Sequence, residues 1–202
     1  MARMSPPTLD EKVVPVLGPD ALGKLRSGCS GDRFEDLRDS AIMAFLLDTG
    51  ARLAELVALR TVDVDRKAGA ALVTGKGRRE RRVYFTPATA LAIDRYLRKG
   101  RAKHTQKADV AFWLGHSGPL TDNGVAQMLN RRGRAAGLGR IHAHQFRHTF
   151  AHDMKSAGLG DDELMALAGR RSPQMLARYG ASARAERAEA SYRRITEGKE
   201  RP

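Results

Sequence analysis

The chain has 202 residues, of which 42% are hydrophobic and 29% are charged, enough for one sizeable core. Lys and Arg number 36 against 23 Asp and Glu, so the formal net charge is +13. This excess favours a polyanionic partner, most simply nucleic acid, although a basic surface that only solubilises the protein is the alternative. Cys29 is the only cysteine, which excludes an intrachain disulfide framework and a cysteine-based zinc site. We see neither a signal peptide nor a membrane span, and expect a cytoplasmic protein.

The N-terminal part of the chain predicts a leader followed by helices. Residues 1–18 are rich in proline and lack a helical period, so we interpret them as a leader or the remnant of an interdomain linker. Residues 20–25 predict a short helix. Residues 32–49 predict a longer one, because their apolar residues recur at three and four positions and Gly50 can close the helix in the left-handed conformation.

A further helix is expected to begin at Arg52. Arg52 and Glu55 are three residues apart and can pair on one face. They form either an ordinary surface pair or an arrangement in which Glu55 orients the Arg52 guanidinium toward a phosphate.

Between residues 62 and 85 the apolar period changes to two, which predicts a small antiparallel sheet. The sheet contains a basic hairpin in which Lys76 stands between Gly75 and Gly77. Glycines there allow the backbone to approach a bulky partner closely; a solvated basic turn is the alternative reading.

Two helices with threonine caps follow the sheet. Thr86-Pro87 begins one that runs to about Lys99, and we expect Leu91 and Leu97 to face inward. Thr121 begins another, which ends at Gly137. Its outer face offers either a phosphate-facing surface or a merely solvated one, made of Arg131, Arg132 and Arg134.

A helix from about residue 142 to residue 157 carries an unusual group of basic residues. Its apolar positions recur every four residues and predict one core-facing side, formed by Phe146, Phe150 and Met154. His144 and Arg147, three residues apart, are neighbours on an adjoining face. An imidazole beside a permanent cation suits an oxyanion such as a phosphate.

The histidines of this helix also raise the possibility of a zinc site, because His144, His148 and His152 recur every four residues. Gln145 follows His144, however, where the helix of a zinc protease has glutamate. With no other ligand cluster in the sequence, we predict that the protein binds no metal.

The last third of the chain predicts more helices. Asp161 begins one that ends at Gly169, and Ser172-Pro173 begins the next, which carries Tyr179. Residues 182–202 form a charged helical tail with few apolar anchors, which can dock onto this molecule or a neighbour.

Four segments resemble motifs of the tyrosine recombinase (phage integrase) family, in the family's order and at matching separations. They are Thr49–Leu56 with Arg52, the Gly75-Lys76-Gly77 hairpin, His144-Gln145-Phe146-Arg147, and Leu167-Ala168-Gly169 followed ten residues later by Tyr179. The resemblance extends over about residues 15–185. It implies the catalytic-domain fold of that family, mainly α with a small three-stranded antiparallel β-sheet.

The resemblance also implies an activity: site-specific recombination of double-stranded DNA through a covalent 3′-phosphotyrosine link to Tyr179, without metal, other cofactor or ATP. Arg52 and Arg147 would hold the non-bridging phosphate oxygens. His144 would act as general base or position the phosphate, and Lys76 would protonate the leaving 5′ oxygen.

Further residues are expected to support this chemistry. Glu55 and His148 would support the site. Contacts with DNA are assigned to Arg78, Arg79, Arg81, Arg131, Arg132 and Arg134. The tail would mediate self-association into a tetramer on DNA. The protein would act at the prokaryotic nucleoid or be encoded by a phage.

Arg170 departs from the family pattern, which usually has histidine and less often tryptophan at this position. An arginine also donates to a phosphate oxygen, so we include Arg170 in the catalytic set. Two alternatives remain: a type IB topoisomerase-like enzyme, and a non-catalytic DNA-binding module, which Arg170 favours. The expected organisation is a leader (1–18), a catalytic domain (19–181) and a helical tail (182–202), without an N-terminal DNA-clamping domain.

Overall fold

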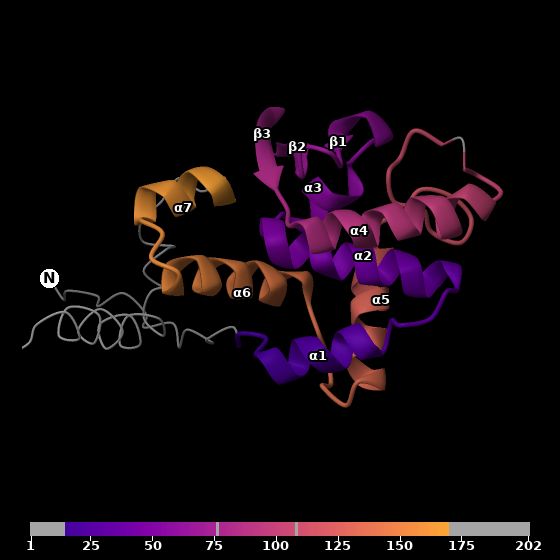
Figure 1. Ribbon diagram of the computed structural model, residues 1–202, viewed down its shortest axis with the longest axis horizontal. Coiled ribbons are helices and arrows are strands. Elements are labelled where there is room, and N and C mark those ends of the chain that lie inside the picture. The colour runs from indigo at the N-terminus through magenta and orange to yellow at the C-terminus, as the bar shows by residue number, and fades with distance from the viewer. Residues whose placement is uncertain (1–14, 76, 108, 170–202) are drawn as a thin grey trace, which may run out of the picture.

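The computed structural model describes residues 15–75, 77–107 and 109–169 (Figure 1). Lys76, Arg170, Tyr179, the tail and most of the expected leader lie outside the described residues. The helices and strands, in chain order, are α1 (Pro19–Ser27), α2 (Phe34–Thr49), α3 (Leu53–Val57), β1 (Val64–Asp65), β2 (Ala70–Gly75), β3 (Arg79–Tyr84), α4 (Pro87–Arg95), α5 (Asp122–Ala135), α6 (Ala143–Ser156) and α7 (Asp161–Ala168). None of the helices in these ranges is long and apolar enough to cross a membrane.

Helix α2 forms the centre of the core. It packs against α4 and α6, and Ile42, Phe45 and Leu46 are fully buried between them. The helix ends as expected at Gly50, which adopts the left-handed conformation (φ 55°) and donates its N–H to the Leu46 carbonyl. Gly50 therefore turns the chain sharply into α3.

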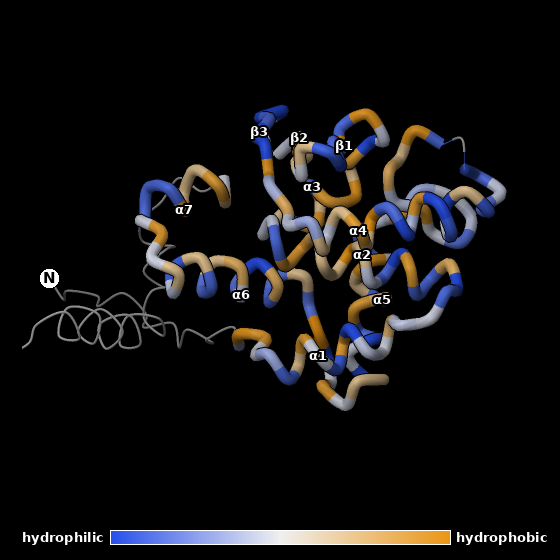
Figure 2. Tube along the Cα trace, viewed as in Figure 1, coloured by the Kyte–Doolittle hydropathy of each residue, from blue (hydrophilic) through white to orange (hydrophobic). Residues whose placement is uncertain are grey.

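The three strands form one antiparallel sheet in the order β1-β2-β3, which confirms the expected mainly α fold with a small three-stranded sheet. Val73 pairs with Arg81, and Gly75 pairs with Arg79. Because side chains alternate across a strand, Arg81 shares the inner face with buried Val83, while Arg82 lies exposed on the opposite face. The end of the sheet at which β3 begins is strongly hydrophilic (Figure 2).

Two expected details of the packing differ in the structure. Leu91, expected to face inward, is 62% exposed, and Ile93 and Tyr96 on α4 and the turn after it are buried instead. Leu17, assigned to the leader, is buried, and its N–H donates to Thr149 Oγ1 at 2.9 Å. The packed structure therefore begins before residue 18.

Helices α6 and α7 extend from one side of the core (Figure 1). Phe146 belongs to the main core, whereas Phe150 forms a small separate cluster with Ala151 and Leu164. The predicted apolar face of α6 is thus confirmed. Its outer half holds α7 by a small apolar contact, and α7 also contacts β3.

Candidate active site

One cleft of about 1160 Å³ gathers residues that are far apart in the sequence. They come from α3, the β2–β3 hairpin, α6 and α7, and include Arg52, Glu55, Arg79, Arg81, His144 and Arg147. The cleft is also lined by Gly75 and Gly77, which flank Lys76, and by Gly169, which precedes Arg170. Among the described lining residues four arginines face two glutamates, so the cleft suits an anion.

Arg52 stands immediately before α3 in an extended conformation. Its backbone N–H donates to Glu55 Oε2 at 2.8 Å, and its Nη1 donates to Glu55 Oε1 at 2.6 Å. The same carboxylate therefore caps the start of the helix and orients the guanidinium. The Arg52 side chain remains 44% exposed, whereas that of Glu55 is 2% exposed.

Glu55 is ionised although it is buried. Burial raises its pKa, but the hydrogen bond from the Arg52 N–H and the charges of Arg81 and Arg52 outweigh burial, so the pKa of Glu55 lies below its usual value. Glu55 is therefore a fixed negative charge at neutral pH and not a proton donor.

Arg147 is buried on α6. Its Nη1 donates to the Gly50 carbonyl and its Nη2 to the Ala168 carbonyl. His144, one turn earlier on α6, is exposed and lines the same cleft, and His148, one turn further along α6 than His144, is buried. The helix thus places His144 and Arg147 in the cleft as its spacing predicted, and directs His148 into the protein.

The C-terminal end of α7 is held by three arginines. Arg81 donates to the Leu167 carbonyl, Arg147 to the Ala168 carbonyl and Arg52 to the Gly169 carbonyl, at 2.6–2.7 Å. Cations are favourable at this end of a helix, where the carbonyls lack helical partners. The arginines of the cleft therefore also fix the end of α7.

Arg81 does not lie where it was expected. It was expected to contact DNA, but its side chain is only 15% exposed and donates to Glu55 Oε2 and the Leu167 carbonyl. The sequence did contain a signal for this burial, because Arg81 and apolar Val83 are two residues apart and therefore share a face of β3. Arg78 and Arg79 are exposed. His142, which also lines the cleft, was not singled out from the sequence.

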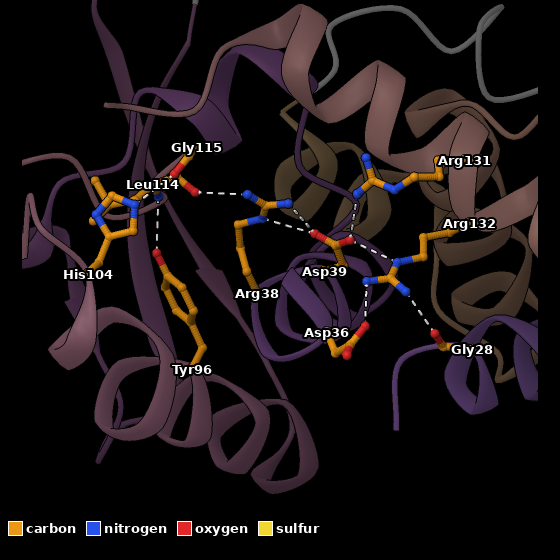
Figure 3. A network of polar contacts seen from close by, with 10 residues as sticks. All are labelled: Gly28, Asp36, Arg38, Asp39, Tyr96, His104, Leu114, Gly115, Arg131 and Arg132. Atoms are coloured by element: carbon orange, nitrogen blue, oxygen red, sulfur yellow. Dashed lines mark hydrogen bonds and ion pairs between the residues drawn. The ribbon is translucent and has the colours of Figure 1, made fainter. Parts of the chain in front are cut away.

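The basic face expected on α5 is divided in the structure (Figure 3). Arg132 does not lie on the outer face: it donates to Asp36, Asp39 and the Gly28 carbonyl. The physical reason is that Asp36 and Asp39 are buried on α2 and require counterions. Arg131 pairs with Asp39 at 3.2 Å but stays 57% exposed, and Arg134 is exposed.

The histidines of α6 do not converge on a metal site in the described part of the chain. No group of three or more His, Cys, Asp or Glu residues there is placed to hold a metal ion.

Solved structures with the same fold show the class of protein to which this fold belongs. It matches the crystal structure of XerA recombinase with a TM-score of 0.75 and 25% identity, over 87% of this chain and 64% of that chain. It also matches the Tn1549 transposon integrase in complex with transposon right end DNA, with a TM-score of 0.74 and 21% identity over 93% of this chain and 68% of that chain. The fold is that of tyrosine recombinase catalytic domains.

A model of the phage integrase family matches residues 17–186, and the chain belongs to this family. The resemblance expected from the four motifs is thereby confirmed. One relative, tyrosine recombinase XerC of Oceanobacillus iheyensis, is 35% identical over 140 residues, which are 67% of this chain and 46% of the relative. The chain spans about half the length of the curated relatives it matches.

Proposed function

We propose that the chain is the catalytic part of a site-specific recombinase, which cleaves and rejoins double-stranded DNA. The observation that carries the proposal is the convergence of Arg52, His144 and Arg147 on one cleft, together with the glycines that flank Lys76 and precede Arg170. Family membership and the DNA complex of a structural neighbour support it.

In the proposed reaction the Tyr179 Oη attacks a phosphorus atom of the DNA backbone. The bond from phosphorus to the 5′ oxygen breaks, and a 3′-phosphotyrosine link forms. His144 accepts the tyrosine proton or positions the phosphate, and Lys76 gives a proton to the departing 5′ oxygen. A different 5′-hydroxyl then reverses the step, so the bond energy is conserved without ATP.

Arg52 and Arg147 bind the non-bridging oxygens, which gain charge as the tyrosine attacks. Each guanidinium presents donors in a planar fork that matches a phosphate. Because these donors are oriented by Glu55 and by backbone carbonyls before substrate arrives, little reorganisation accompanies the reaction. Arg170 adds a further donor, and the cationic side chains supply the stabilisation for which other phosphoryl-transfer enzymes use a metal ion.

Residues around the cleft complete the proposed site. Glu55 and His148 act as structural supports. Exposed cations on the hairpin and on α5 contact DNA phosphates, namely Arg78, Arg79, Arg131 and Arg134. We further propose that the protein acts on cytoplasmic DNA and assembles there as a tetramer through residues 182–202. If deletion of residues 183–202 left assembly on DNA intact, the tail would have no part in it.

A nicked suicide duplex tests the proposed chemistry. The DNA is recovered by binding selection from a random-sequence library, and the nick is moved along the selected duplex until it lies beside the cleaved phosphate. The released fragment diffuses away, so covalent protein–DNA complex accumulates. The complex is expected with the wild-type protein and not with Tyr179→Phe. No complex at any nick position would overturn the proposal, and relaxation of any supercoiled plasmid, irrespective of site, would favour a topoisomerase.

The role of Lys76 has a separate test. Lys76→Ala should slow cleavage, because the 5′ oxygen then leaves without a proton. A 5′-bridging phosphorothiolate, whose sulfur leaves without protonation, should restore the rate. Failure of this substrate to restore cleavage would exclude Lys76 as the general acid.

A further inference from the structure

A single carboxylate is shared by two arginines at the base of the cleft. Glu55 Oε1 accepts from Arg52 Nη1 at 2.6 Å, and Glu55 Oε2 accepts from Arg81 Nη2 at 2.8 Å. Glu55 is only 2% exposed, so water competes weakly with these partners. The position of Arg52 therefore depends on a carboxylate that Arg81 holds from the other side.

The two arginines differ in what they can reach. Both guanidinium forks are engaged, that of Arg52 with Glu55 and the Gly169 carbonyl and that of Arg81 with Glu55 and the Leu167 carbonyl. The Arg52 side chain is nevertheless 44% exposed, whereas that of Arg81 is only 15% exposed. Arg82, the next residue along β3, projects from the opposite face and is exposed. Arg81 is therefore poorly placed for a DNA phosphate, although it lies in the most basic stretch of the sequence.

Arg81 packs closely against Gly169 at the end of α7. A Cβ atom on Gly169 would lie 2.6 Å from Arg81 Nε and 2.8 Å from its Cδ, so only glycine admits the guanidinium at the end of α7. Arg81 thereby joins three elements: its own strand β3, Glu55 on α3 and the end of α7. In the chain, these elements begin or end within three residues of Lys76, Arg52 and Arg170.

Sharing of Glu55 also sets the local charge. One carboxylate between two guanidinium groups leaves a formal charge of +1, whereas Arg52 and Glu55 alone would be neutral. A neutral pair stabilises the charge that the phosphate gains in the transition state less strongly than the trio does. Removal of Arg81 would therefore weaken Arg52 in two ways, by loosening its partner and by leaving its charge fully compensated.

We propose that Arg81 is a positioning residue for strand cleavage: without touching DNA, it fixes Glu55 and, through Glu55, the guanidinium of Arg52. The proposal rests on the function proposed above, and assigns Arg81 a role different from that of the exposed hairpin arginines. It predicts a loss in the rate of cleavage and not in the affinity for DNA.

The test separates these two quantities with the selected suicide duplex. The variants are Arg81→Met, Arg81→Lys and the matched control Arg82→Met, assayed at a temperature at which circular dichroism shows each of them folded. Affinity is measured against salt concentration, and cleavage is measured in a single turnover with protein in saturating excess. Tyr179→Phe supplies the background.

Arg81→Met should reduce saturated cleavage roughly 10- to 100-fold, as expected for a displaced catalytic group, with affinity and its salt dependence unchanged. Arg81→Lys keeps the charge but reaches only one of the two acceptors, so its rate should lie between those of Arg81→Met and wild type. Arg82→Met should cleave like wild type. The 5′-bridging phosphorothiolate should not rescue Arg81→Met, because the defect lies in stabilising the phosphate in the transition state and not in protonating the leaving oxygen.

Two outcomes would overturn the proposal. A direct phosphate contact by Arg81 would appear as a lower affinity, a salt slope smaller by about 0.9 and normal cleavage at saturation. Equal cleavage by Arg81→Met and wild type would also exclude the positioning role while leaving the proposed function intact. A wild-type protein that forms no covalent complex would instead overturn the function, and this role with it.

Discussion

The Arg147 guanidinium donates to the Ala168 carbonyl at 2.7 Å, so a side chain of α6 holds the last turn of α7. The same group donates to the carbonyl of Gly50 at the end of α2. Two backbone acceptors on different helices therefore fix its plane before any phosphate is bound. Such preorganised donors are effective because they need no rearrangement in the transition state.

Arg147→Lys should lower the saturated rate of suicide cleavage by about 100-fold or more, the scale for the loss of one oriented oxyanion donor. Lysine keeps the charge, but a single ammonium does not reproduce a fork that donates to two carbonyls and, in the proposed reaction, to a phosphate. Single-turnover cleavage checks this, with circular dichroism as the control for folding. A variant that cleaves at the wild-type rate would show that charge alone suffices at this position.

Gly50→Ala should destabilise the protein by about 2–5 kcal/mol, from backbone strain and overpacking together. Gly50 has φ 55°, and a Cβ there would lie 2.9 Å from Cγ of Phe150. Gly137 is a matched control, with φ 73° and no atom within 4 Å of such a Cβ. Gly137→Ala should therefore lose only about 1–2 kcal/mol. Urea unfolding compares the two, and equal losses would contradict the close approach to Phe150.

Local signals in the sequence were sufficient for most of the elements. Glycine after an apolar period marked the end of α2 at Gly50, and Thr121 marked the start of α5, where its Oγ1 accepts from the Gly124 N–H. These features depend on residues within one turn, which a single sequence contains. The motif order then identified the family, and with it the fold.

Tertiary partners explain what the sequence did not predict. Arg132 and Arg134 are both arginines on α5, but only Arg132 meets buried carboxylates, and these come from α2. Leu91 was expected inside because it is apolar, yet the face of α4 that meets α2 is the one with Ile93. Arg81 stands in a basic run, and only strand register separates it from its exposed neighbours. Basic composition therefore indicates a partner but not which arginines touch it.

Arg132→Met and Arg134→Met should affect different properties of the protein, the first its stability and the second its affinity for DNA. The first removes one of three arginines from buried Asp39 and one of two from buried Asp36, and should destabilise the protein by about 1.5–3 kcal/mol. The second should change stability by less than about 0.5 kcal/mol and lower the affinity for duplex DNA. Urea unfolding and salt-dependent DNA binding measure the two effects. A stability loss with Arg134→Met and none with Arg132→Met would contradict the network in Figure 3.

Glu55 should contribute to the acid sensitivity of folding. Its pKa in the folded protein is held below the usual value of 4.5, so its stabilising effect is present above that value and is lost as pH falls through the folded pKa. The difference in unfolding free energy between wild type and Glu55→Gln should therefore shrink as pH falls from above 4.5 through the lower folded pKa. Denaturant titrations across this range measure it. A difference that stays constant would mean that Glu55 has the same pKa folded and unfolded.

Cys29 lies in the loop between α1 and α2 and should be inert in the folded protein, reacting only when the contact between this loop and Arg132 of α5 opens. Burial raises the pKa of its thiol to about 11, against the lowering effect of the Arg132 charge, so little thiolate exists near neutral pH. Labelling with a disulfide reagent should therefore be slow in buffer and fast in denaturant.

The rate of that labelling also reports on the ion pairs beside Cys29. Arg132 Nη1 donates to the carbonyl of Gly28, the preceding residue, at 2.8 Å. Its loss in Arg132→Met should make local opening more frequent, and labelling in native buffer should accelerate accordingly. Loss of the Arg132 charge would by itself raise the thiol pKa further and slow the reaction. Faster labelling of Arg132→Met would thus identify opening as the cause, and slower labelling would show that Arg132 acts on Cys29 through charge and not by closing this contact.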